Sequence, residues 1–202
     1  MSIAPTVPAL SFAPELLLKG QGVQVAFFDV DGVLTDGGLY FAEYPEGHAN
    51  AGLINGFQSS GETIKRFNTL DGHGLKLLQL AGITPVIITG RDSAVLRARL
   101  HALGIRHAYF GCEDKLPAAE MALQALGVDW TSAAAMGDDW PDLPVMRRAK
   151  IACAPVNAHA EVIAQAHHVT SDAGGHGAVR EFCDLLLVAS GRYAGLLASY
   201  NQ

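Results

Sequence analysis

Short apolar runs alternate with amphipathic segments along most of this 202-residue chain. Apolar runs bounded by Gly, Asp or Pro are typical of strands buried on both faces of a parallel sheet. The predicted strands are residues 23–29, 83–89, 108–110, 132–136, 151–154 and 168–170. The predicted helices are residues 13–19, 74–81, 94–103, 117–126, 142–148, 159–166 and 178–190. This alternation predicts an α/β fold, a Rossmann-like doubly wound parallel sheet in a single domain of residues 1–202.

Polar residues mark where two of these helices are expected to begin. Asp71 precedes the apolar positions of the helix over 74–81, and it is the predicted start of that helix. Asp92 or Ser93 is the predicted cap of the next helix, because a short polar side chain there accepts a hydrogen bond from a free backbone N–H.

One segment, residues 37–67, departs from the alternation of strands and helices. Residues 39–41 and 63–67 are predicted to form the two strands of a β-hairpin, with the glycine-rich residues 42–61 between them. We therefore expect a hairpin or loop insert directly after the first strand and no separate cap domain.

Composition narrows the class of protein. Half of the residues are hydrophobic and 17% are charged, which is typical of a globular chain. The formal net charge of -6 and the lack of a basic run argue against a nucleic-acid partner. No apolar run approaches the ~20 residues of a membrane span. The N-terminus lacks a signal-peptide pattern, and the three cysteines are widely spaced, so we expect a cytoplasmic chain with reduced thiols.

Polar side chains gather where the predicted strands end or a helix begins. The carboxyl ends of parallel strands meet at one edge of a sheet, so these side chains are expected to lie together. The set comprises Asp29, Asp31, Thr89, Gly90, Lys115, Asp138, Asp139 and Asp142. Neighbouring carboxylates favour a hard divalent cation such as Mg²⁺, and a lysine with a hydroxyl suits a phosphate group. The combination indicates phosphoryl transfer, in which one carboxylate can attack phosphorus.

Four motifs carry a resemblance to a known family. Residues 29–37, Asp-Val-Asp-Gly-Val-Leu-Thr-Asp-Gly, resemble the first motif, DxDGxxTDG, of the haloacid dehalogenase (HAD) superfamily. Thr89-Gly90, Lys115 and residues 137–142 resemble its second, third and fourth motifs, in the same order. Residues 174–181, Gly-Gly-His-Gly-Ala-Val-Arg-Glu, are similar to a run in the 3-deoxy-D-manno-octulosonate 8-phosphate phosphatases of this superfamily. The resemblance spans residues 23 to 191.

The resemblance implies a role for each acid. Asp29 would be the nucleophile that forms an aspartyl-phosphate, and Asp31 would be the general acid and then the general base. Asp29, the backbone carbonyl of Asp31 and Asp138 would bind Mg²⁺. The expected enzyme is a phosphoric monoester hydrolase.

The resemblance also implies which residues bind the phosphate group. The resemblance implies that Thr89 and the backbone amide of Gly90 contact phosphate oxygens. It also implies that Lys115 neutralises the negative charge of the carboxylate and the phosphate.

The resemblance also suggests a substrate, a small acidic sugar phosphate, and specifically 3-deoxy-D-manno-octulosonate 8-phosphate of lipopolysaccharide precursor synthesis. However, Leu70 stands where the family pattern F-[NH]-V-R-D-G has arginine. Arg66, Arg91 and Arg99 remain as candidate substrate-binding residues. Leu70 keeps open a phosphatase for a nine-carbon 3-deoxy sugar 9-phosphate, and a non-catalytic oligomerisation module of the same fold is a second, separate alternative.

The resemblance further implies an assembly. Phosphatases of this kind without a large lid are usually homotetramers, in which the hairpin of one subunit helps to close the site of the next. The C-terminal residues 191–202 are a second candidate for reaching a neighbouring site.

Overall fold

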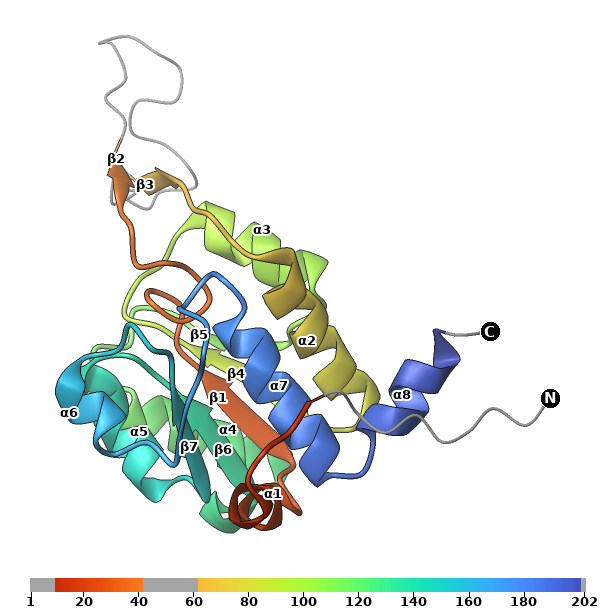
Figure 1. The fold of residues 1–202 in the computed structure, drawn as a ribbon. Coiled ribbons are helices and arrows are strands. Elements are labelled where there is room, and N and C mark those ends of the chain that lie inside the picture. The colour runs from red at the N-terminus through yellow and green to blue at the C-terminus, as the bar shows by residue number, and fades with distance from the viewer. Residues whose placement is uncertain (1–9, 42–61, 201–202) are drawn as a thin grey trace, which may run out of the picture.

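The computed structural model describes residues 10–41 and 62–200 of the chain, and in it a six-stranded parallel sheet lies between two layers of helices (Figure 1). The strands follow the order β5-β4-β1-β6-β7-β8, with every neighbouring pair parallel. Their bounds are β1 Val25–Phe28, β4 Thr84–Ile88, β5 His107–Tyr109, β6 Ala133–Met136, β7 Ile151–Ala154 and β8 His168–Val169. The predicted Rossmann-like fold is confirmed.

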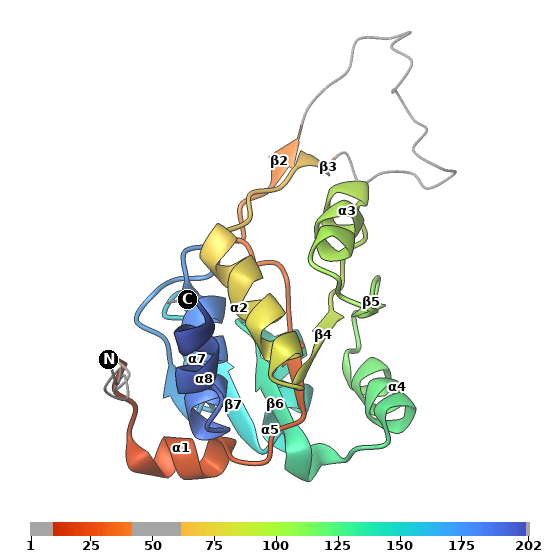
Figure 2. The same ribbon diagram turned by 90° about the vertical axis from the view of Figure 1, so that its right-hand side faces the viewer.

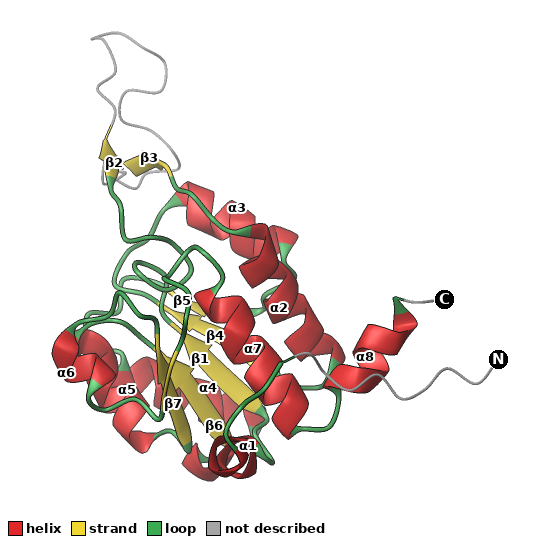
Figure 3. Ribbon diagram, in the orientation of Figure 1, coloured by secondary structure: helices red, strands yellow, loops and turns green. Residues whose placement is uncertain are grey.

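Each face of the sheet has its own apolar core. One core is shared with α2 (Thr69–Leu80), α3 (Ala94–Ala102) and α7 (Ala178–Ala189), and the other with α4 (Leu116–Leu126), α5 (Leu143–Arg148) and α6 (Ala160–Ile163). Figure 3 shows the strands enclosed by helices in this way. The short α1 (Pro14–Gly20) packs against α7.

Strand β1 contributes to both cores because its side chains alternate between the faces. Ala26 and Phe28 belong to one core, whereas Val25 and Phe27 belong to the other. Phe28 meets Phe182 of α7 edge to face, with ring centroids 6.1 Å apart. The strand that leads to the first acidic motif is thus anchored on two sides.

Of the two helix starts predicted from polar residues, one differs in the structure and one agrees. Helix α2 begins at Thr69, and its N-cap is Asn68, whose side chain accepts the Leu70 N–H at 2.8 Å. The expectation that Asp71 opens this helix is wrong. Asp71 is buried, and its Oδ1 accepts the Arg180 N–H at 2.9 Å near the start of α7. Ser93 is the cap of α3, as predicted, with its Oγ accepting the Leu96 N–H.

The insert after β1 contains the two predicted hairpin strands, β2 (Tyr40–Phe41) and β3 (Glu62–Ile64), which pair antiparallel in a separate sheet, but the second ends at Ile64 rather than at Phe67. The expectation of a glycine-rich loop falls on residues 42–61, which lie outside the described residues. Figure 2 shows the β2–β3 ribbon standing apart from the central sheet, beyond the ends of α2 and α3.

The C-terminal segment forms a further helix, α8 (Tyr193–Ser199), which packs on α7 of its own chain. Tyr200 lies against His73 of α2, with 5.8 Å between ring centroids. Among the described helices, none is long and apolar enough by itself to cross a membrane. The α7–α8 pair passes that test by length and composition only, with a bend of 109° between its members.

The loop after β1 is clamped by the loop before α7. Gly175 N donates to Val33 O at 2.9 Å. Asn157 bridges the two loops, donating to Gly32 O at 3.1 Å and accepting the Gly174 N–H at 2.6 Å. A Cβ atom built on Gly174 would overlap the carbonyl oxygen of Gly32. The approach of these two backbones therefore requires glycine at position 174.

We predict that Gly174→Ala lowers the free energy of unfolding by about 1–3 kcal/mol, because the added methyl group forces the two loops apart. Urea denaturation followed by circular dichroism measures this change. Gly195→Ala is the control, since Gly195 of α8 has open space around it. Equal stability of the Gly174→Ala variant and the wild type would contradict the clamp.

Candidate active site

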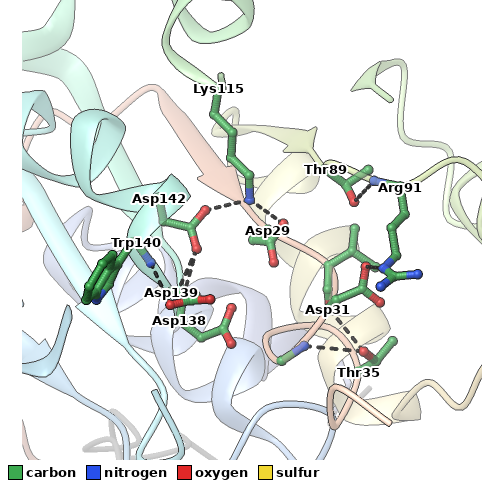
Figure 4. A network of polar contacts seen from close by, with 12 residues as sticks. Asp29, Asp31, Thr35, Thr89, Arg91, Lys115, Asp138, Asp139, Trp140 and Asp142 are labelled. Atoms are coloured by element: carbon green, nitrogen blue, oxygen red, sulfur yellow. Dashed lines mark hydrogen bonds and ion pairs between the residues drawn. The ribbon is translucent and has the colours of Figure 1, made fainter. Parts of the chain in front are cut away.

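The predicted acidic, hydroxyl and lysine residues meet at the carboxyl edge of the central sheet (Figure 4). Asp29 directly follows β1, Thr89 follows β4, and Asp138 lies two residues beyond β6. Lys115 directly precedes α4. Strand order explains the meeting, because β1 lies between β4 and β6 and the three strands are parallel.

Lys115 joins two carboxylates from different parts of the chain. Its Nζ donates to Asp29 Oδ1 at 2.5 Å and to Asp142 Oδ1 at 2.6 Å. All three side chains are less than a tenth exposed. Burial lowers the pKa of Lys115, but the two carboxylates more than offset this effect, and the pKa is raised. Lys115 is therefore a fixed positive charge beside Asp29.

Three carboxylates form the acidic cluster, defined as Asp29, Asp138 and Asp142. One oxygen from each lies within 4.8 Å of the others. Asp142 is held in place by protein contacts, since its Oδ2 also accepts the N–H groups of Asp138 at 3.0 Å and Asp139 at 3.2 Å. Asp142 thus supports the turn that presents Asp138.

The electrostatics of this cluster favour a bound cation. Burial raises the pKa of Asp29, and the Asp142 charge raises it further. Burial, together with the charges of Asp29 and Asp142, raises the pKa of Asp138 to about 8. Carboxylate oxygens are the ligands that Mg²⁺ prefers, and a divalent cation would compensate both acids. Asp29 and Asp138 therefore fit a magnesium site.

The backbone around the first motif is shaped to admit Asp138. Gly32 has φ +88°, and a Cβ atom there would overlap the Asp138 carboxylate. Thr35 holds the turn, donating to Val30 O at 3.2 Å and accepting the Gly37 N–H at 3.3 Å. The glycine of the DxDG pattern is thus required by both conformation and space.

Several known proteins are similar in sequence to this chain. A family model described as haloacid dehalogenase-like hydrolase matches residues 111–182. The 3-deoxy-D-manno-octulosonate 8-phosphate phosphatase KdsC of Salmonella typhimurium is 37% identical over 180 residues, 89% of this chain and 87% of that protein. The chain belongs to the 3-deoxy-D-manno-octulosonate 8-phosphate phosphatase family of haloacid dehalogenase-like hydrolases.

Solved structures of this family share the fold. The phosphatase of this name from Moraxella catarrhalis, in complex with magnesium, phosphate and KDO, has a TM-score of 0.80 and 34% identity, covering 92% of this chain and 98% of that chain. The cobalt-bound Haemophilus influenzae enzyme has a TM-score of 0.76 and 36% identity, covering 87% and 93%. Metal ions are thus present in two structures of the family.

Asp31 faces a different set of partners from Asp29. Lys65 Nζ donates to its Oδ1 at 2.6 Å, and Arg91 Nε lies 3.7 Å from its Oδ2. The carboxylate of Asp31 does not belong to the acidic cluster, which leaves only its backbone carbonyl as the predicted metal contact. Figure 4 shows Asp31 beside Thr89 and Arg91, on the opposite side of Asp29 from Asp138.

Thr89 and Gly90 occupy the turn that follows β4. Thr89 is buried, and its Oγ1 accepts the Arg91 N–H at 3.2 Å. Gly90 is exposed. Their place beside Asp29 and Asp31 is suited to phosphate oxygens, in line with the roles that the motifs suggested.

The three candidate arginines lie in different places. Arg91 lies beside Asp31, whereas Arg66 Nη1 lies 3.4 Å from Asp36 Oδ2 and 2.8 Å from His176 Nε2. Arg99 donates to Asn68 O at 3.2 Å and lies over the Phe67 ring. Arg99 thus packs α3 against the start of α2, and its contacts within the described residues do not include the acidic cluster.

Lys65 is a site residue that the motif pattern missed. The sequence does carry a signal for this position, since Lys65 and Phe67 are two residues apart in an extended segment. In the structure Ile64 and Arg66 are exposed, Lys65 is 8% exposed and Phe67 is half-buried. A lysine on the same side of an extended segment as a phenylalanine is expected to point inward. From the sequence, Lys65 is predicted only as a residue of the strand over 63–67.

We predict that Mg²⁺ raises the melting temperature and that the increment is larger at about pH 8.5 than at about pH 6. The folded-state pKa of Asp138 lies above its unfolded value of 3.8. The metal-free protein therefore loses stability as pH rises from the unfolded toward the folded pKa, while the growing carboxylate fraction strengthens metal binding. Differential scanning fluorimetry with MgCl₂ or EDTA measures both effects.

Asp138→Asn is the matched variant for this prediction. It replaces a carboxyl whose pKa the cluster raises with a neutral amide, so the metal-free protein should be at least as stable as the wild type at neutral pH. The increment from Mg²⁺ should largely disappear. An undiminished increment in Asp138→Asn would show that the ion binds elsewhere.

Proposed function

We propose that this protein is a Mg²⁺-dependent phosphatase that hydrolyses 3-deoxy-D-manno-octulosonate 8-phosphate, a step in the synthesis of lipopolysaccharide precursors. The observation that carries the proposal is the position of Asp29 between Lys115 and Asp138, in a chain whose relatives bear the name of this activity. Asp142 shares Lys115 and the cluster with Asp29, but its other oxygen is held by the N–H groups of Asp138 and Asp139, so Asp29 is the better candidate to meet phosphorus.

The proposed reaction has two steps on Asp29. A carboxylate oxygen of Asp29 forms a bond to phosphorus while the bond from phosphorus to the sugar oxygen breaks, and the leaving oxygen takes a proton from Asp31. Water then attacks the aspartyl-phosphate, gives a proton back to Asp31, and releases phosphate. Lys115 offsets the negative charge that would otherwise repel the phosphate.

Other groups orient the phosphate and the metal. Thr89 and the amide of Gly90 donate to phosphate oxygens. Asp29, Asp138 and the backbone carbonyl of Asp31 would hold Mg²⁺, which supplies charge stabilisation to the phosphoryl group when bound.

Charge in the exposed part of the site supports an acidic sugar as substrate. Arg91 and Arg66 both retain exposed side chains, with 41% and 51% exposure, and can meet a carboxylate. Leu70, which is 55% exposed at the start of α2, replaces the family's arginine and favours testing a nine-carbon 3-deoxy sugar 9-phosphate as a second substrate.

We also propose a homotetramer located in the cytoplasm. Leu39, Tyr40 and Ile64 expose 41%, 47% and 60% of their surface on or beside the β2–β3 ribbon. A two-stranded ribbon is marginally stable by itself, so packing against another subunit would stabilise it. Sedimentation equilibrium measures the subunit count.

A panel of sugar-acid phosphates with added Mg²⁺, read by phosphate release, tests the substrate. We expect the highest kcat/KM for the eight-carbon 8-phosphate. Preference for the nine-carbon 9-phosphate would favour the second substrate. A stable tetramer without activity on any member would support the non-catalytic alternative. EDTA should abolish the activity and Mg²⁺ should restore it.

We predict that Asp29→Asn has no measurable turnover yet folds at least as stably as the wild type. The amide cannot act as the nucleophile, and the change removes a buried carboxylate whose pKa burial has raised. Phosphate release and circular dichroism measure the two properties. Asp129→Asn, at an exposed site before β6, is the control. Turnover by Asp29→Asn at the wild-type rate would exclude the covalent mechanism.

A further inference from the structure

Lys65 extends from the insert into the site on its own chain. It follows β3 directly, and its side chain is only 1% exposed. Its Nζ donates to Asp31 Oδ1 at 2.6 Å, a distance that indicates a strong charge-assisted hydrogen bond. The segment that carries the β2–β3 ribbon therefore also supplies a cation to the first acidic motif.

The two oxygens of Asp31 have different surroundings. Oδ1 is held by Lys65, whereas the nearest guanidinium atom to Oδ2, Arg91 Nε, is 3.7 Å away, beyond hydrogen-bond distance. The Asp31 side chain keeps 23% exposure, in contrast to 8% for Asp29. One oxygen of Asp31 is thus fixed and the other is open to an incoming molecule.

The two acids of the DxD motif are each held by a separate lysine. Lys115 binds Asp29 and Lys65 binds Asp31. Asp31 lies two residues after Asp29 and its side chain points to a different side of the loop (Figure 4). Because Lys115 is already shared with Asp142, a second cation is needed to hold Asp31 in its own orientation.

We infer that Lys65 is a positioning residue for Asp31, an inference that rests on the proposed function. By binding Oδ1, Lys65 turns Oδ2 toward the oxygen that leaves phosphorus. Lys65 itself exchanges no proton. In the first step a proton passes from Asp31 Oδ2 to the leaving oxygen and departs with the alcohol, and in the second step Asp31 Oδ2 takes a new proton from the attacking water. Removal of Lys65 should therefore slow proton transfer to the leaving oxygen more than any other step of the reaction.

Aryl phosphates test this inference because their leaving groups differ in the need for a proton. Nitrophenolate departs readily as an anion, whereas phenolate, of nearly the same size, gains more from acid catalysis. We expect Lys65→Met to slow single-turnover phosphoryl transfer from phenyl phosphate about tenfold more than transfer from p-nitrophenyl phosphate, a loss typical of a misplaced catalytic group. Rapid-quench measurement of the released phenol and nitrophenol gives both rates.

Two further variants separate positioning from a structural role. Lys65→Arg retains a charged donor and should restore part of the rate with phenyl phosphate, and it also serves if Lys65→Met fails to fold. Lys76→Met removes an exposed lysine of α2 and should leave both rates unchanged.

The outcomes distinguish the inference from the proposed function. If Lys65→Met lowers the transfer rates from the two esters by the same factor, Lys65 only fastens the insert or binds phosphate. That result would overturn the inference but not the proposed function. Unchanged rates would overturn it as well. A wild-type protein that hydrolyses neither an aryl phosphate nor any sugar phosphate in the presence of Mg²⁺ would overturn the proposed function, and the inference with it.

Discussion

Lys115 reaches into a group of three carboxylates, and its ammonium group bonds the two that are buried, Asp29 and Asp142. Burial of like charges is unfavourable, and one lysine cannot balance three acids. The remaining imbalance appears in the raised pKa of Asp138. The excess negative charge that weakens the metal-free site favours a bound cation, so part of the stability of this region is coupled to ligand binding.

The surrounding backbone makes this concentration of charge possible. Gly32 leaves room for the Asp138 carboxylate, and Gly174 lets a second loop approach the first motif closely. Asn157 then satisfies one backbone group of each loop. The glycine-rich run before α7 therefore acts on the site through contact with the loop after β1, although none of its glycines belongs to the acidic cluster.

The insert contributes to the site on the side of Asp29 that faces away from Asp138. Its β2–β3 ribbon projects away from the central sheet, yet the residue directly after β3 is a buried lysine on Asp31. An insert that supplied only an oligomer contact would not need a cation in this position. The two acids of the first motif are thus held by elements far apart in the sequence, Lys115 before α4 and Lys65 after β3.

Much of this arrangement follows from the sequence alone. The period of the apolar residues determined the strands and helices, because burial on a sheet or a helix face imposes that period. The order of the motifs placed Asp29, Asp31, Thr89, Lys115 and Asp138 at one sheet edge, because parallel strands end there. Neither argument requires distances between residues.

Only the tertiary structure determined which residues the charged side chains contact. The sequence predicts that Asp71 begins a helix. In the structure α2 packs against α7, and Asp71 accepts a hydrogen bond from the Arg180 N–H. Arg99 is a predicted substrate-binding residue, and the structure adds that it bonds Asn68 O and lies over the Phe67 ring. The sequence predicts Lys65 only as a residue of a strand, whereas in the structure its ammonium group binds the Asp31 carboxylate. The partner of a charged side chain depends on which elements meet in space, and sequence spacing carries that information only within one helix or strand.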